Sequence, residues 1–196
     1  MDFKFHVILL IILLSLSSSL QSSSSLQPSL SSSISSSSSL SSSISLSSSS
    51  CNTSYQEYYA LYSLYNSTNG IYWNTNCSKN WNFLYNYSNP CNDQYPWNGI
   101  TCNNQCQIII LSLSYCNLTG TIPYHLGSLI NLTSFYLNDN INLTGTIPSQ
   151  LGYMIEIQHF FLNNSGLTGT IPFQLSFMSS TVNFNLIGNS LKNRIF

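Results

Sequence analysis

A pattern that recurs every 24 or 25 residues limits the possible folds of this chain more than any other feature of its sequence. The same positions recur in consecutive segments from residue 108 to residue 191. In order, the columns are Ile108, Leu132, Ile157 and Thr181; Leu111, Phe135, Phe160 and Phe184; Leu113, Leu137, Leu162 and Leu186; Cys116, Asn140, Ser165 and Asn189; and Leu118, Leu143, Leu167 and Leu191. Each segment therefore follows L-x-x-L-x-L-x-x-N/C-x-L, with one residue inserted before Leu143 and serine replacing asparagine at Ser165.

The repeated pattern predicts one short strand in each segment, because alternating apolar positions give a strand one inward face. A single segment cannot bury that face alone, so neighbouring segments must stack into a solenoid. The side chains of the Asn column can bond backbone groups that the turn after each strand leaves unpaired. Apolar pairs three residues apart predict a short 3₁₀ or helical turn on the opposite, convex side: Leu126 and Leu129, Leu151 and Met154, and Leu175 and Met178.

A second motif, L-T-G-T-I-P, occurs at residues 118–123, 143–148 and 167–172. It resembles the plant-type subfamily of leucine-rich repeats, whose consensus continues as IPxxLGxLxxL, as Ile122 to Leu129 do here. The resemblance covers about residues 55–196. It implies an α/β solenoid, a right-handed superhelix with short parallel strands on the concave face and 3₁₀ or short helical turns on the convex side. Residues 108–196 would hold three full repeats and a truncated fourth, so that the solenoid ends in an uncapped apolar edge that could associate with a partner.

Residues 51–107 are predicted to form a compact N-terminal cap. Ser54 and Glu57 are spaced as a capping box, which marks the start of a helix. Asn69-Gly70 offers the left-handed residue that ends a helix. The bulky rings of Trp73, Trp81 and Trp97 need a hydrophobic environment. A helical cap stabilised by disulfides accounts for these features together.

The chain has six cysteines, an even number that favours a disulfide framework in an exported chain, although six allow about 15 pairings. A metal site is disfavoured because Cys102 and Cys106 have neither a matching second pair nor a nearby histidine. The segment before the repeats resembles the N-terminal cap of plant-type repeat proteins. The resemblance rests on Ala60-Leu61 to Asn69-Gly70, Trp73, Pro90-Cys91 and residues 97–102. That resemblance implies a disulfide between Cys91 and Cys102, at a wider spacing than in the usual cap. The remaining cysteines stay unassigned: Cys51, Cys77, Cys106 and Cys116.

The N-terminal segments indicate export. Residues 1–20 combine Lys4 and His6, an apolar run and then small residues, as in a secretory signal peptide; an uncleaved anchor is the alternative. Residues 21–50 are mostly serine and cannot bury enough apolar surface to fold. They are interpreted either as an O-glycosylated stalk or as a neutral expansion of a repetitive tract. No later segment has the ~20 apolar residues that a membrane span needs.

Sequons for N-glycosylation agree with a secreted, extracellular glycoprotein of the cell surface or wall. They begin at Asn52, Asn66, Asn76, Asn86, Asn117, Asn131, Asn142 and Asn163. Only 5% of the residues are charged, with four Lys or Arg against five Asp or Glu. The chain therefore lacks the basic surface that nucleic acids require. No cofactor, metal or catalytic site is expected, because the carboxylates do not form the pair that glycoside hydrolysis needs.

The predicted function is binding on the concave face, where the residues between the apolar columns point outward. The candidate ligand-binding residues are Tyr115, Tyr136, Asn138, Asp139, His159, Phe161, Asn163 and Asn185. Further outward positions are Ile110, Ser112, Ser114, Ser134, Asn164 and Asn183. Tyr136 and Phe161 would stack as an exposed aromatic ladder, which can grip a peptide or sugar. Strand propensity alone is the alternative explanation, and a glycan on Asn163 would partly block the face.

An extracellular protein or peptide, or a glycan, is the expected partner. The family resemblance implies a receptor ectodomain, a co-receptor or an inhibitor of a foreign wall-degrading enzyme. Two alternatives are a structural glycoprotein of the wall or matrix and a truncated receptor-like fragment. Repeats alone do not distinguish these roles, because one fold supports many functions.

Overall fold

The computed structural model describes residues 52–83 and 89–192. Its helices are α2 (Tyr55–Ser67) and the 3₁₀ turns η1 (Gly70–Tyr72), η2 (Tyr124–Ser128), η3 (Ser149–Tyr153) and η4 (Phe173–Phe177). Its strands are β1 (Ile100–Cys102), β2 (Ile108–Ser112), β3 (Gly120–Thr121), β4 (Ser134–Tyr136), β5 (Leu143–Thr144), β6 (His159–Phe161), β7 (Thr168–Thr170), β8 (Asn183–Asn185) and β9 (Ser190–Lys192). The predicted signal peptide (1–20) and serine-rich segment (21–50) lie outside the described residues.

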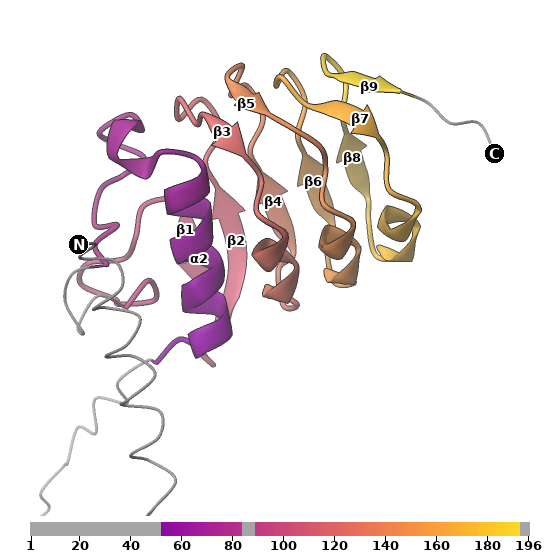
Figure 1. The fold of residues 1–196 in the computed structure, drawn as a ribbon. Coiled ribbons are helices and arrows are strands. Elements are labelled where there is room, and N and C mark those ends of the chain that lie inside the picture. The colour runs from indigo at the N-terminus through magenta and orange to yellow at the C-terminus, as the bar shows by residue number, and fades with distance from the viewer. Residues whose placement is uncertain (1–51, 84–88, 193–196) are drawn as a thin grey trace, which may run out of the picture. The chain divides into compact units, whose positions relative to one another are not determined.

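The main sheet has the order β1-β2-β4-β6-β8 and carries one strand from each repeat (Figure 1). β1 from the cap pairs antiparallel with β2, and the strands after β2 are parallel. The register aligns Leu111 with Phe135, Phe135 with Phe160, and Phe160 with Phe184. Residues of one predicted column therefore lie side by side. This confirms the expected leucine-rich-repeat solenoid.

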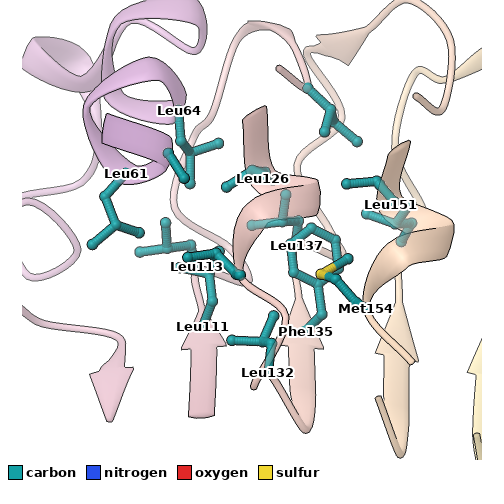
Figure 2. Close-up of a cluster of buried hydrophobic side chains, with 14 of the residues drawn as sticks. Leu61, Leu64, Leu111, Leu113, Leu126, Leu132, Phe135, Leu137, Leu151 and Met154 are labelled. Carbon is teal, nitrogen blue, oxygen red and sulfur yellow. The ribbon is translucent and has the colours of Figure 1, made fainter. Parts of the chain in front are cut away.

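The core is a continuous stack of side chains between the main sheet and the 3₁₀ turns (Figure 2). Phe135 and Phe160 are fully buried, with ring centroids 5.2 Å apart. Leu126 of η2 and Leu151 of η3 are also fully buried and enter this core from the convex side. Burying each such side chain contributes about 1.5–3 kcal/mol. Phe184, in the last described repeat, occupies the same column but is 46% exposed, because no further repeat covers it within the described residues.

The convex side is formed by η2, η3 and η4, as the apolar pairs predict. Pro123, Pro148 and Pro172 precede these turns in extended conformation. The turns stack closely: a Cβ on Gly127 would lie 2.3 Å from the backbone oxygen of Gln150 in the next turn. The glycine that follows the buried leucine of this turn therefore sets the spacing between repeats, because a side chain there would push the next turn away.

The Asn column performs the predicted role. The Asn140 amide donates to the carbonyls of Leu113 and Leu137, both at 2.9 Å. Its Oδ1 accepts from the backbone N–H groups of Cys116 (3.0 Å) and Leu118 (3.1 Å). Asn189 likewise donates to the carbonyls of Leu162 and Leu186. One buried side chain thus satisfies backbone groups of two successive repeats.

In the third repeat the serine leaves a gap in this column. Ser165 Oγ is buried and has no hydrogen-bond partner. The backbone closes the gap itself: Leu143 N–H donates to the Asn140 carbonyl at 2.9 Å, and Gly166 N–H donates to the Leu143 carbonyl at 2.9 Å. The residue inserted before Leu143 permits this local turn, so the shorter serine side chain is tolerated.

The cap begins as predicted. Ser54 and Glu57 form the capping box of α2, and Asn69, rather than Gly70, adopts the left-handed conformation (φ 53°) after the helix. Gly70 is required for another reason, since a Cβ there would lie 2.1 Å from the Tyr65 ring. Glu57 also reaches the repeats, because its Oε1 accepts from Ile108 N–H at 2.9 Å. One carboxylate therefore both caps α2 and pairs the first residue of β2.

Disulfides join the cap internally and to the first repeat. The predicted Cys91–Cys102 bond is confirmed. A second bond joins Cys77 of the cap to Cys116 of the Asn column, 39 residues apart in the sequence. Cys106 is also disulfide-bonded, while Cys51 lies outside the described residues. The three tryptophans are buried and pack against one another, so the cap has a compact aromatic core.

Candidate ligand-binding face

The solvent-facing side of the main sheet, called the concave face below, brings most of the predicted binding residues together. They fall into two groups. The aromatic column consists of Tyr136, His159 and Phe161 on β4 and β6. The polar rim follows the carboxyl ends of the strands and consists of Ser114, Tyr115, Asn138, Asp139 and Asn164. The two groups are continuous, since Asn138 and Asp139 come two and three residues after Tyr136.

The aromatic column is built by strand register. Tyr136 pairs with Phe161, and their rings stack with centroids 5.3 Å apart. The His159 ring stacks on Tyr136 at 6.5 Å, and its Nδ1 lies 2.9 Å from Asn183 Nδ2. All three rings are partly exposed. Rings held at this spacing by a rigid sheet offer a flat apolar surface that loses little entropy when it binds a ligand.

The polar rim is shaped by a left-handed backbone residue after each strand. Tyr115, Asp139 and Asn164 have φ values of 57°, 60° and 52°, and Gly188 has 76° at the equivalent position of the last described repeat. Asparagine, aspartate and glycine tolerate this conformation, whereas for a bulky tyrosine it is unusual. The conformation turns these side chains along the edge of the face, where residues from successive repeats meet.

The Asp139 carboxylate accepts hydrogen bonds from three other side chains of the polar rim. Asn164 Nδ2 donates to its Oδ1 at 2.8 Å, and Asn138 Nδ2 and the Tyr115 hydroxyl donate to the same carboxylate. Ser114 Oγ donates to Asn138 Oδ1 at 2.6 Å, which extends the network into the first repeat. The bonds from Asn164 and Asn138 lower the pKa of Asp139, and the bond to Asp139 raises the pKa of Tyr115. The rim thus presents an ionised carboxylate held in a fixed orientation.

The other predicted positions are less central. Asn185 follows Phe161 in the register, but its Oδ1 accepts from Ile187 N–H at 3.0 Å and closes a local turn. Asn163 is only partly exposed, and its buried Oδ1 has no hydrogen-bond partner. Ser134, expected to point outward, is instead 8% exposed. The reason is that the longer side chains of Ile110 and His159 flank it in register and cover it.

The sequence identified the members of the face but not the hydrogen-bond network that joins its rim. The available signal was the column Tyr115, Asp139, Asn164 and Gly188, since three of these residue types favour left-handed backbone. In residues 52–83 and 89–192, no group of His, Cys, Asp or Glu side chains could hold a metal ion. Over the same residues, no helix is long and apolar enough to cross a membrane.

Comparisons with known proteins agree with this architecture. Residues 54–103 match the family model described as Leucine rich repeat N-terminal domain. A relative in Arabidopsis thaliana, the probable LRR receptor-like serine/threonine-protein kinase At4g37250, is 44% identical over 54 residues, which are 28% of this chain and 6% of that protein. The probable leucine-rich repeat receptor-like protein kinase At5g49770 of the same species is 32% identical over 93 residues, covering 42% and 9%. The chain thus spans less than a tenth of either relative.

Two solved structures show the same arrangement. The PEPR1-AtPEP1 structure superimposes with a TM-score of 0.62 and 25% sequence identity. The match covers 70% of this chain and 18% of the chain in that structure. The LRR ectodomain of the receptor kinase SOBIR1 from Arabidopsis thaliana superimposes with a TM-score of 0.55 and 21% sequence identity. The match covers 71% of this chain and 70% of the SOBIR1 chain, and it supports the fold alone. The repeat columns, strand register and these matches agree on a leucine-rich-repeat solenoid fold, and the cap residues 54–103 are similar to the leucine-rich-repeat N-terminal domain.

Proposed function

We propose that this chain is an extracellular, non-enzymatic recognition module that binds a protein or peptide on its concave face. The observation that carries the proposal is the aromatic column lying directly beside the polar rim on one rigid sheet. Rings supply contact area and the rim supplies orientation, which is the division of roles found in binding sites with a few dominant residues.

The chemistry of the face favours a peptide over a small molecule. The Tyr136 and Phe161 rings form an open surface, and successive rim residues follow one another along the strand ends. An extended ligand lying across the repeats could place apolar side chains on the rings and its backbone amides against the rim. Asp139 remains able to accept a further hydrogen bond from a ligand, since a carboxylate has about four acceptor sites. An N–H-rich or cationic group is therefore the expected partner of Asp139.

The comparisons support the receptor-like part of the proposal. At 25% identity, the PEPR1-AtPEP1 structure is a leucine-rich-repeat protein of similar fold, and the matched relatives are named receptor-like kinases. Disulfides in the cap support an oxidising compartment outside the cell. Five sequon asparagines are exposed, as glycosylation requires: Asn52, Asn66, Asn76, Asn117 and Asn142. Asn131 and Asn163 are partly exposed, and Asn86 lies outside the described residues.

The proposal is tested by selecting ligands on the folded protein. Full-length protein secreted from a eukaryotic host is immobilised and panned with a phage-displayed library of random peptides. For an enriched peptide, Tyr136→Ala and Phe161→Ala should each weaken binding at least about tenfold, the loss expected for central aromatic contacts. Tyr153→Ala and Phe177→Ala are matched controls, because these rings are exposed on the convex turns. They should leave affinity unchanged.

Two outcomes would contradict the proposal. Selection could yield no peptide with saturable binding, or the convex substitutions could weaken binding as much as the concave ones. A chain whose retention in the wall or matrix depends on its serine-rich segment, and not on Tyr136 or Phe161, would fit a structural glycoprotein instead.

A further inference from the structure

A groove of about 770 Å³ lies away from the concave face, between the cap helix and the first repeats. One wall is α2, which lies alongside the first repeat (Figure 1). The opposite wall is formed by the L-T-G-T-I-P segments of the first two repeats and by the start of η2. The groove is called the α2 groove below. Its walls come from parts of the chain more than 50 residues apart, so the sequence alone does not indicate it.

The α2 groove is lined by aromatic rings with hydroxyl and amide groups between them. Tyr59 and Tyr62 project from α2 and are 40% and 41% exposed, while Tyr124 across the groove is 57% exposed. His125 links the walls: its ring meets Tyr59 edge-on at 4.9 Å and lies 3.9 Å from Tyr124. No acid or base other than the histidine lines the groove. Exposed rings with neutral polar groups suit a ligand that has both apolar C–H faces and hydroxyls, which is the chemistry of a sugar.

A sequon for N-glycosylation lies on the α2 wall of the groove. Asn66 is exposed, lines the groove and begins the sequence Asn66-Ser67-Thr68 at the end of α2. Tyr62 is four residues before Asn66 and Tyr59 is seven before it, so the three side chains form one stripe along the helix. A rise of 1.5 Å per residue places the two rings roughly 6 and 10 Å along the helix axis from Asn66.

The direction of the side chains aims a glycan into the groove. Side chains on an α-helix lean toward its N-terminus and cover the preceding turn. A sugar attached to Asn66 Nδ2 therefore leads back over Tyr62 and then Tyr59, and not away past the helix end. An N-linked glycan begins with two N-acetylglucosamine units, whose length is comparable to the distance from Asn66 to the second ring.

We propose that the α2 groove holds the two N-acetylglucosamine units of an N-glycan on Asn66, stacked on Tyr62 and Tyr59 and enclosed by Tyr124 and His125. The glycan then contacts both the cap and the first repeat and strengthens the joint between them. The inference depends on the extracellular location in the proposed function, but not on any ligand of the concave face.

The test measures how accessible this glycan is in the folded protein. The full chain is secreted from a host that adds high-mannose N-glycans, and endoglycosidase H, which cuts between the two N-acetylglucosamine units, is applied under native conditions. Site-resolved mass spectrometry follows release at Asn66 and at Asn142, an exposed sequon asparagine in the turn before β5 that does not line the groove. Release at Asn66 should be about fivefold slower, given the typical strength of ring stacking. The two rates should converge after denaturation.

Substitutions identify the cause of the protection. Tyr62→Ser should raise the Asn66 rate to that of Asn142, whereas Tyr62→Phe, which keeps the ring, should preserve the protection. Tyr124→Ser on the opposite wall should raise the rate in the same direction. A wild-type circular dichroism spectrum and a cooperative thermal transition show that each variant remains folded. An unoccupied Asn66, equal native rates at the two sites, or protection that survives Tyr62→Ser would overturn the inference. None of these outcomes alters the concave face, so Tyr136→Ala and Phe161→Ala test the proposed function separately.

Discussion

The cap and the repeats reach stability by different means. In the cap, Trp73, Trp81 and Trp97 cluster with Phe83, with ring centroids 4.7–6.3 Å apart, and disulfides join the surrounding loops. In the repeats, the same leucine and phenylalanine columns pack against their neighbours, and the asparagines Asn140 and Asn189 bond the turns. A short irregular segment has no identical neighbour to stack on, so it depends on large rings and covalent bonds. Repeats instead gain stability at each interface.

The joint between the two regions uses both means. Cys116 occupies the Asn column of the first repeat but bonds to Cys77 of the cap. Glu57 caps α2 and also pairs Ile108 of β2. Because these contacts cross from one region to the other, they are the most informative places to test how far the two regions depend on each other.

The largest effect is expected from removing the disulfide that crosses the joint. Replacing Cys77 and Cys116 together with alanine should lower the free energy of unfolding by about 4 kcal/mol, and replacing Cys91 and Cys102 by about 3 kcal/mol, because the second bond closes a shorter loop. The sequence separations are 39 and 11 residues. Chemical denaturation of both pairs provides the comparison. A larger loss from the shorter loop would show that the joint is not where covalent bonding matters most.

The next largest loss of stability is expected from removing a side chain of the Asn column, which bonds the turns of the repeats. Asn140→Ala leaves backbone groups of Leu113, Leu137 and Leu118 without their side-chain partner. The expected loss is about 3 kcal/mol, because unpaired buried polar groups are costly. Asn189→Ala, at a partly exposed position, is the control and should cost less. Equal losses in urea denaturation would indicate that burial does not determine the value of this column.

A smaller loss is expected at Glu57. Glu57→Ala removes the capping box and leaves Ile108 N–H unpaired, and it should cost about 2 kcal/mol. Glu57→Gln keeps an amide oxygen in place and should recover part of that loss. Comparing the thermal unfolding of Glu57→Ala and Glu57→Gln separates the contribution of the hydrogen-bonding oxygen from that of the negative charge. If both variants unfold at the wild-type temperature, α2 does not depend on its bond to β2.

The smallest effect concerns pH and the concave rim. The folded pKa of Asp139 is lowered, so the stabilisation from its hydrogen bonds is present above the unfolded pKa, about 3.9, and is lost as pH falls through the lower folded value. The stability difference between wild type and Asp139→Asn should therefore shrink below about pH 4. The same substitution should return the raised pKa of Tyr115 toward its ordinary value, which ultraviolet titration can follow. An unchanged Tyr115 titration would contradict the rim network.

The sequence predicted the parts of this protein that depend on local spacing. The columns through Leu111 and Phe135 set the strands and their register, Ser54 and Glu57 set the start of α2, and apolar pairs set the convex turns. Each of these follows from periodicity or from neighbours within a few residues. The sequence also named Tyr136, Phe161 and Asp139 as members of the concave face, because strand alternation fixes which side chains point outward.

Only the tertiary structure decided the features that depend on contacts between distant segments. It paired Cys77 with Cys116, buried Ser134 between the longer side chains of two neighbouring strands, and joined the rim through Asp139. It also brought α2 against the first repeat to form the groove beside Asn66. Spacing along the chain cannot indicate these features, since the distance between two segments depends on how every intervening turn packs.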